Sequence, residues 1–212
     1  MAFRQESDGR VESSLRRRET LRNHQVRPAG SADEAISLGG ALAEAGIAVV
    51  EVAYTTPNAA IAVASLCSAY PAVTVGAGTI LDAAAAYTAV EAGARFLVSP
   101  VVAEEVLRAG HRYGAAVIPG ACTPTEIQTA MELGADAVKL FPASAFGTGY
   151  LRAIATALPQ VPFVPTGGVT VENARSWLDA GAVAVGIGGG LTAGTPAHIR
   201  DGAARLLAEL AT

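Results

Sequence analysis

The chain alternates between short apolar runs and longer alanine-rich stretches, and this alternation limits the folds that it can adopt. Continuous apolar runs of this length are typical of parallel strands that are buried on both faces. Between successive runs there is room for one helix, so the pattern predicts an α/β fold built from repeated strand–helix units. We expect strands at Ala48–Tyr54, Val73–Gly76, Phe96–Val98, Ala116–Ile118, Ala137–Phe141, Phe163–Pro165 and Ala182–Ile187, with a weaker first strand near Gln25–Arg27.

Glycines mark the ends of the expected helices. Glycine is favoured just past a helix because it adopts left-handed backbone angles without steric cost. The four glycines concerned recur at intervals of about 41 to 47 residues, and each interval holds two strand–helix units. Eight units of this size account for a compact (β/α)8 TIM barrel over residues 25–212, as a single domain. The alternative is a doubly wound open sheet, which is less favoured because no G-x-G-x-x-G follows the first strand. The helix ends in question are Glu44-Ala-Gly46, Glu91-Ala-Gly93, Glu132-Leu-Gly134 and Asp179-Ala-Gly181.

Residues 1–24 differ from the rest because they hold six of the chain's arginines. Ser13 and Ser14 are placed to cap a short helix. We expect this Arg-rich segment to be a tail or helix that covers one end of the barrel. An arm that binds an anion or a partner is the alternative.

The composition excludes several classes of protein. Hydrophobic residues make up 51% of the chain and charged residues 16%, which excludes intrinsic disorder. A net charge of −4 argues against a dedicated nucleic-acid binder. No apolar run approaches the roughly 20 residues of a membrane helix, and no secretory signal is visible. Two cysteines and three scattered histidines predict neither a disulfide framework nor a metal site. We therefore expect a cytoplasmic enzyme without a cofactor.

Lys139 is the only lysine of the chain, and it lies inside an apolar run between Val138 and Leu140. Burying a charged amine is costly, so such a position favours the neutral and nucleophilic amine. Schiff-base chemistry requires that species. The alternative is an arginine-rich composition with one lysine left by chance.

Other polar residues fall at the expected strand ends, where (β/α)8 barrels carry their active sites. Glu51 lies between Val50 and Val52, so a strand would bury its carboxylate or direct it into the barrel. Burial favours the protonated form, which suits a group that shuttles protons. A structural glutamate paired with an arginine is the alternative. The glycines of Thr166-Gly167-Gly168 and of residues 188–190 end the last two strands, where loops of these barrels bind phosphate.

Taken together, several motifs resemble those of the 2-keto-3-deoxy-6-phosphogluconate (KDPG) and 4-hydroxy-2-oxoglutarate (KHG) aldolases. They occur in the family's order between about Val26 and Leu191. The resemblance implies a (β/α)8 barrel, a metal-independent class I aldolase that acts on a 2-keto acid, and a homotrimer. The motifs are Glu51-Val52, Val75-Gly-Ala-Gly-Thr-Ile80, Val98-Ser-Pro100, Ile118-Pro-Gly120, Val138-Lys-Leu-Phe-Pro-Ala143 and Phe163-Val-Pro-Thr-Gly-Gly168.

The resemblance also implies roles for individual residues. Lys139 matches the Schiff-base lysine and Glu51 the proton-shuttling glutamate, while Thr79 matches a threonine that holds the pyruvyl carboxylate. Positions that line the substrate site correspond to Phe141, Thr166 and the Pro100 turn, and the phosphate cradle corresponds to Gly167, Gly168 and Gly188.

Three departures from the family pattern concern the substrate. Thr55 stands where the family has an arginine that clamps the substrate carboxylate, a contact worth about 1.5–3 kcal/mol. Arg27, near the end of the first strand, is placed to compensate. Gly189 replaces a serine that helps to bind phosphate. Lastly, the first strand is polar, reading Asn23-His-Gln-Val-Arg27.

Two other functions remain open from the sequence. One is a phosphate-binding barrel that acts as an isomerase or synthase without an imine, with Glu51 as base and Lys139 as a charged anchor. The other is a non-catalytic descendant that binds a ligand or partner.

Overall fold

A computed structural model describes residues 22–26 and 29–211 of the 212-residue chain, with side chains described from Ala29 to Leu210. Strands and helices alternate along it as the sequence predicts. The strands are β1 (Arg22–Val26), β2 (Val49–Ala53), β3 (Thr74–Gly78), β4 (Phe96–Val98), β5 (Ala116–Ile118), β6 (Gly120–Ala121), β7 (Val138–Leu140), β8 (Phe163–Pro165) and β9 (Val185–Ile187). The helices are α2 (Ala32–Glu44), α3 (Ala59–Ala69), α4 (Ala83–Glu91), α5 (Glu104–Arg112), α6 (Pro124–Glu132), α7 (Gly147–Ala157), α8 (Ala174–Asp179), α9 (Gly189–Thr192) and α10 (Pro196–Ala211), with a short 3-10 turn η1 (Ala143–Ala145) before α7.

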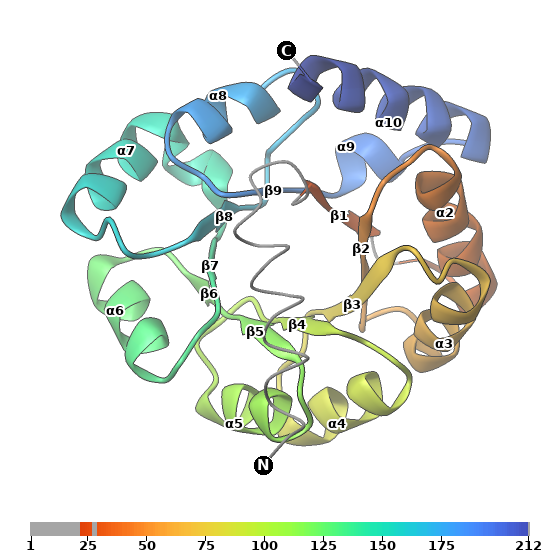
Figure 1. Ribbon diagram of the computed structural model, residues 1–212, viewed down its shortest axis with the longest axis horizontal. Coiled ribbons are helices and arrows are strands. Elements are labelled where there is room, and N and C mark those ends of the chain that lie inside the picture. The colour runs from red at the N-terminus through yellow and green to blue at the C-terminus, as the bar shows by residue number, and fades with distance from the viewer. Residues whose placement is uncertain (1–21, 27–28, 212) are drawn as a thin grey trace.

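The parallel strands form a closed ring with the helices outside it (Figure 1). One sheet has the order β5-β4-β3-β2-β1-β9 and the other β6-β7-β8. A parallel bridge between Thr166 and Gly186, together with a 3.0 Å hydrogen bond from the Val183 N–H to the Phe163 carbonyl, joins β8 to β9. The predicted (β/α)8 barrel is therefore confirmed, and the open sheet is excluded.

The fifth barrel strand is divided into β5 and β6 at Pro119. Proline has no N–H to donate to a neighbouring strand. Its carbonyl still accepts a 2.9 Å hydrogen bond from the Lys139 N–H, so the ring stays closed at this position.

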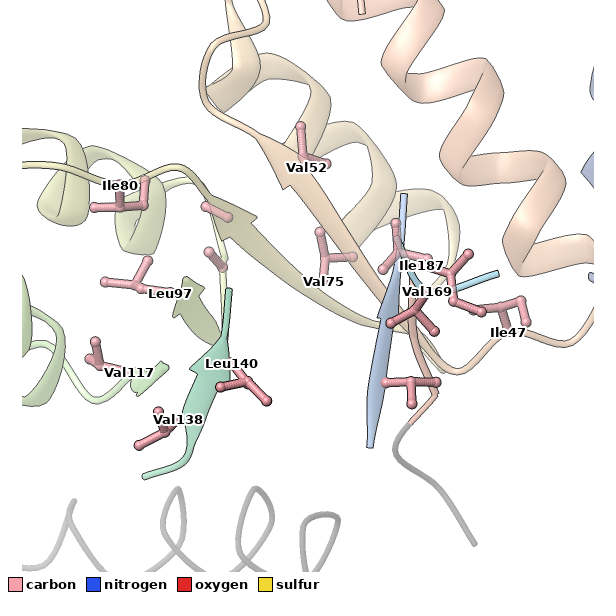
Figure 2. Packing of buried hydrophobic residues seen from close by; sticks show 14 of the residues in the cluster. Ile47, Val52, Val75, Ile80, Leu97, Val117, Val138, Leu140, Val169 and Ile187 are labelled. Carbon is pink, nitrogen blue, oxygen red and sulfur yellow. The ribbon is translucent and has the colours of Figure 1, made fainter. Parts of the chain in front are cut away.

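The larger part of the core lies between the strands and the helices. Alternate strand residues, such as Val52, Leu97 and Ile187 (Figure 2), belong to this part of the core together with apolar helix residues. Side chains of successive strand residues point to opposite faces. The residues between these therefore face the inside of the barrel.

A second apolar cluster fills the inside of the barrel. Its buried members are Val49, Phe96, Val98, Ala116, Ile118, Ala137, Val164 and Ala184, all from strands or the residue or two before a strand. No helix contributes to it among the described residues. Small residues make room where they are needed: a Cβ on Gly76 would lie 2.3 Å from the Phe96 ring. This layer closes the barrel beneath the strand ends that carry the polar residues.

The helix boundaries follow from the predicted end signals. Gly46, Gly93, Gly134 and Gly181 all have positive φ angles, between 89° and 107°, as expected just past a helix end. Thr123 and Glu126 form a capping box at the start of α6, in which each residue's side chain accepts from the other's backbone N–H. At α2 only half of the box forms. The Ser31 hydroxyl accepts from the Glu34 N–H, whereas the Glu34 carboxylate accepts from Gly30.

The polar first strand forms, and it begins earlier than predicted. β1 pairs with β2 and β9, and it starts at Arg22 rather than near Gln25. The last three residues of the predicted Arg-rich segment 1–24 thus belong to the barrel, while its remaining residues lie outside the described part of the chain. None of the helices described is long and apolar enough to cross a membrane.

Candidate functional site

The two principal candidates, Glu51 and Lys139, both project into the barrel above the inner apolar layer. Glu51 follows Val49 by two residues on β2, and Lys139 follows Ala137 by two at β7, so each shares the inward face of its strand. Only 1% of Glu51 and 4% of Lys139 is exposed. The structure thus gives the barrel interior an acid and an amine, both screened from bulk water.

The Glu51 carboxylate lies over the backbone of Gly78 at the end of β3. The residue opposite Glu51 in the strand register is Gly76, so the side chain leans toward the carboxyl ends of the strands. A Cβ on Gly78 would lie 1.8 Å from Glu51 Oε1, a distance that no side chain tolerates. The absence of a side chain at residue 78 therefore sets the position of this carboxylate.

The Lys139 amine lies against an aromatic ring. Its Nζ is 5.0 Å from the centroid of Phe141, within the range of a cation–π contact. The Phe141 ring also lies close to Gly167, where a Cβ would be 3.1 Å from it. Phe141 is 36% exposed, so its ring separates the amine from solvent on this side.

Backbone hydrogen bonds join the loop after β7 to the loop after β8. The Thr166 N–H donates to the Leu140 carbonyl at 3.0 Å, and the Ala143 and Ser144 N–H groups donate to Thr166 and Gly167 at 2.8 Å. The two loops therefore continue the β7–β8 pairing beyond the strands. This fixes the predicted residue Thr166, 4% exposed, beside the lysine strand.

The predicted phosphate glycines leave backbone N–H groups available. Gly167 and Gly168 have φ angles of 85° and 88°. Within residues 29–211, the N–H of neither glycine donates to a backbone carbonyl. At the start of α9, a Cβ on Gly189 would have nothing within 4 Å. Gly188, half-buried, accepts at its carbonyl from Leu191 and Thr192, so its loop turns directly into that short helix.

The remaining predicted residues lie around the same end of the barrel. Thr79 follows β3 with a φ of 60°, a strained conformation for a β-branched residue. Thr55 is exposed in the turn after β2. Pro100 follows β4, and a Cβ on Gly120 would lie 2.4 Å from its carbonyl oxygen. Arg27 lies outside the described residues.

The segment that leads from β6 into α6 flanks the lysine strand on the side away from β8, and several hydrogen bonds hold it in place. The Glu126 carboxylate accepts hydrogen bonds from the Cys122 and Thr123 N–H groups at 3.0 and 2.8 Å, which lowers its pKa to about 2. Burial and the neighbouring Glu126 raise the pKa of the Cys122 thiol, so this cysteine is kept protonated. The Tyr150 hydroxyl donates to the Cys122 carbonyl, and its ring stacks on Phe146.

Charge is scarce at this end of the barrel. In the described stretches, the loops that leave the strand ends contain no lysine or arginine. Those same stretches contain no group of three His, Cys, Asp or Glu side chains that could hold a metal ion. Among the strand residues whose side chains the structure describes, Lys139 is thus the one basic residue of the interior.

Sequence reasoning missed three features. Gly78 leaves space for the Glu51 carboxylate, and this depends on the direction of the Glu51 side chain, which no sequence motif indicates. Ser144 follows Lys139 by five residues, and only the folded loops bring it against Gly168. Tyr54 packs on the outer core with its hydroxyl buried and without a partner among the described residues, and burial raises its pKa to about 12.

Comparison with known proteins identifies the family. The model of the family described as "KDPG and KHG aldolase" matches residues 18–202. The chain is 38% identical to the 2-dehydro-3-deoxy-6-phosphogalactonate aldolase of Escherichia coli (strain K12) over 161 residues, which cover 75% of this chain and 78% of that enzyme.

Two solved structures are similar over nearly the whole chain. A native KDPGal structure has a TM-score of 0.84 at 33% identity and covers 90% of this chain and 95% of its own. The KDPG aldolase of Legionella pneumophila, with pyruvate captured as a covalent carbinolamine, has a TM-score of 0.77 at 31% identity and covers 91% and 93%. The family match, the relatives and the (β/α)8 barrel agree, and the chain belongs to the KDPG and KHG aldolase family of carbon–carbon lyases.

Proposed function

We propose that the protein cleaves a 2-keto-3-deoxy-6-phospho sugar acid into pyruvate and a phosphorylated aldehyde through a Schiff base on Lys139. The observation that carries this proposal is the single lysine of the chain, 4% exposed inside the barrel that also holds Glu51. The covalent pyruvate carbinolamine of the Legionella relative supports it.

In this mechanism the neutral Lys139 amine attacks the C2 ketone of the substrate and forms a carbinolamine. Glu51 moves the protons that allow water to leave, which gives an iminium ion. The C3–C4 bond then breaks as the C4 hydroxyl loses its proton. The aldehyde departs, and the bonding electrons pass into the iminium to form an enamine. Protonation at C3 and addition of water release pyruvate and restore the amine.

Neutral groups bind most of the substrate in this proposal. Thr79 and Thr55 supply hydroxyls near the reacting keto acid, Thr166 lines the site beside the lysine strand, and Phe141 and Pro100 provide apolar walls. In this proposal Arg27 supplies the charge for the substrate carboxylate, in place of the family arginine whose position Thr55 occupies. Gly167, Gly168, Gly188 and Gly189 present the backbone N–H groups for the phosphate.

The first test is reduction with borohydride in the presence of pyruvate, followed by intact-mass and peptide mass spectrometry. Because the chain has one lysine, a pyruvyl adduct on the peptide that contains residue 139 identifies the Schiff base without ambiguity. Lys139→Met serves as the control and should give no adduct there. Arg27→Gln should raise the pyruvate concentration needed for half-maximal trapping by roughly tenfold.

An absent adduct in folded wild-type protein would contradict the proposal. It would favour an isomerase or synthase without an imine, or a non-catalytic ligand-binding protein. If the adduct forms, comparing cleavage of the phosphorylated acid with that of 4-hydroxy-2-oxoglutarate decides between the family's two substrate types.

We also propose that the protein forms a homotrimer. In support, a similar structure, with a TM-score of 0.85 at 33% identity, is a cage designed by fusing symmetric oligomeric domains. Light scattering coupled to gel filtration should give three times the 21.3 kDa chain mass. A monomer or dimer at micromolar concentration would contradict this proposal.

A further inference from the structure

Ser144 lies beside the glycine loop that follows β8. Its N–H donates to the Gly167 carbonyl at 2.8 Å, and a Cβ on Gly168 would lie 2.4 Å from the Ser144 Cβ and 3.1 Å from its Oγ. The serine side chain is exposed and covers one side of Gly168. A hydroxyl on the loop after β7 is thereby held next to the Gly167 and Gly168 N–H groups, which donate to no backbone carbonyl within residues 29–211.

The other hydroxyls of this region are already engaged within the protein. Thr166 Oγ1 donates to the Val164 carbonyl at 3.3 Å, and Thr192 Oγ1 donates to the Gly188 carbonyl at 3.3 Å. Thr170 Oγ1 accepts from the Asn173 N–H. Within the described residues of the loops after β7, β8 and β9, Ser144 alone offers a hydroxyl that makes no hydrogen bond to the protein.

Apart from side chains that already donate to protein carbonyls, such as the Asn173 amide to Gly168 at 3.1 Å, the described loops at this point of the barrel offer backbone donors. Gly189 and Gly190 carry no side chain, and a Cβ on either would meet nothing within 4 Å. The described loops bring no lysine or arginine here. An oxyanion bound here is therefore held by N–H groups, and each added O–H donor to a charged oxygen has a large effect on binding.

We infer that the Ser144 hydroxyl donates a hydrogen bond to the distal phosphate of the substrate and makes the enzyme selective for phosphorylated acids. This inference rests on the proposed function and deepens it. Ser144 supplies the hydroxyl that Gly189 lacks, from the loop after β7 instead of the loop after β9. The lysine chemistry does not depend on it.

The test compares Ser144→Ala with wild type on a 6-phosphorylated 2-keto-3-deoxy acid and on the same acid without phosphate. We expect kcat/KM to fall roughly tenfold or more on the phosphorylated acid and to stay within about twofold on the other. Inorganic phosphate, as a competing probe, should inhibit the variant correspondingly less. The matched control is Thr148→Ala, which removes a hydroxyl from the first turn of α7 and should leave both substrates unaffected.

Borohydride trapping separates this inference from the proposed function. If both proteins trap pyruvate on Lys139 while Ser144→Ala keeps the wild-type selectivity for the phosphorylated acid, the role assigned to Ser144 is wrong and the proposed aldolase function stands. If wild type forms no adduct, the proposed function fails and this inference fails with it. An equal loss of selectivity in Thr148→Ala would also overturn the assignment, because a general disturbance of the loop would then explain both variants.

Discussion

At the scale of single residues, the geometry of the site depends on where side chains are missing. The Glu51 carboxylate occupies the space that a side chain at residue 78 would fill, with 1.8 Å between Oε1 and an added Cβ. The φ angle of Gly78 is not in the left-handed region, so its backbone would accept alanine. The steric conflict with Glu51 is therefore separable from backbone strain.

Gly78→Ala should displace the carboxylate while leaving the barrel folded. We expect the rate of pyruvate trapping on Lys139 to fall on the order of 100-fold, the usual effect of moving a catalytic group by about 1 Å. Gly149→Ala is the control, since a Cβ there meets nothing within 4 Å and should raise stability slightly within helix α7. Stopped-flow trapping and thermal unfolding measure both effects. Trapping by Gly78→Ala at the wild-type rate would show that the position of Glu51 is unimportant.

At the scale of elements, the capping box at the start of α6 stabilises the loop that borders the lysine strand. The Glu126 carboxylate accepts from two backbone N–H groups, which lowers its pKa to about 2 from an ordinary 4.5. A lowered folded-state pKa means that the carboxylate stabilises the fold above the unfolded pKa. That contribution is lost as the pH falls through the folded pKa.

Glu126→Gln should therefore destabilise the protein most at neutral pH. We expect a loss of about 1 kcal/mol at pH 7, because a neutral amide oxygen accepts these hydrogen bonds more weakly than a carboxylate, and a shrinking difference from wild type between about pH 4.5 and pH 2. Urea unfolding of both proteins across that range measures it. A difference that stays constant or grows toward low pH would mean that the carboxylate charge does not stabilise this loop.

Some boundaries of the helices and strands could be predicted from the sequence alone, and others could not. The helix ends were predictable because glycine past a helix is a local preference, and Gly46, Gly93 and Gly134 adopt the expected angles. Lys139 and Glu51 were predictable as inward residues because alternation along a strand is strict. The division of the fifth strand at Pro119 was not, since whether a proline interrupts a strand depends on the pairing of its neighbours. The start of β1 at Arg22 was missed because polar residues carry no strand signal.

At the scale of the whole molecule, the two layers inside the barrel have different tasks. The lower layer, which includes Phe96 and Val164, is apolar and buried. The upper layer holds Glu51, Lys139 and Thr166, which are buried polar groups with a desolvation cost. Ring closure brings residues from β2 and β7, far apart in sequence, into one interior. No motif predicts the contacts within that interior, such as Phe141 between Lys139 and Gly167, because they exist only once the ring is closed.

This division predicts opposite effects for two substitutions. Phe96→Ala empties the lower layer and should cost about 3–5 kcal/mol of folding stability, with trapping of pyruvate retained below the lowered melting temperature. Lys139→Met keeps the length of the side chain and removes a buried amine, so it should be at least as stable as wild type while losing all trapping. Denaturant unfolding and borohydride trapping on the same preparations test both. If Lys139→Met lost as much stability as Phe96→Ala, the upper layer would also stabilise the barrel. Only a lysine whose side chain contributes to the packing of the interior would cause such a loss when it is replaced.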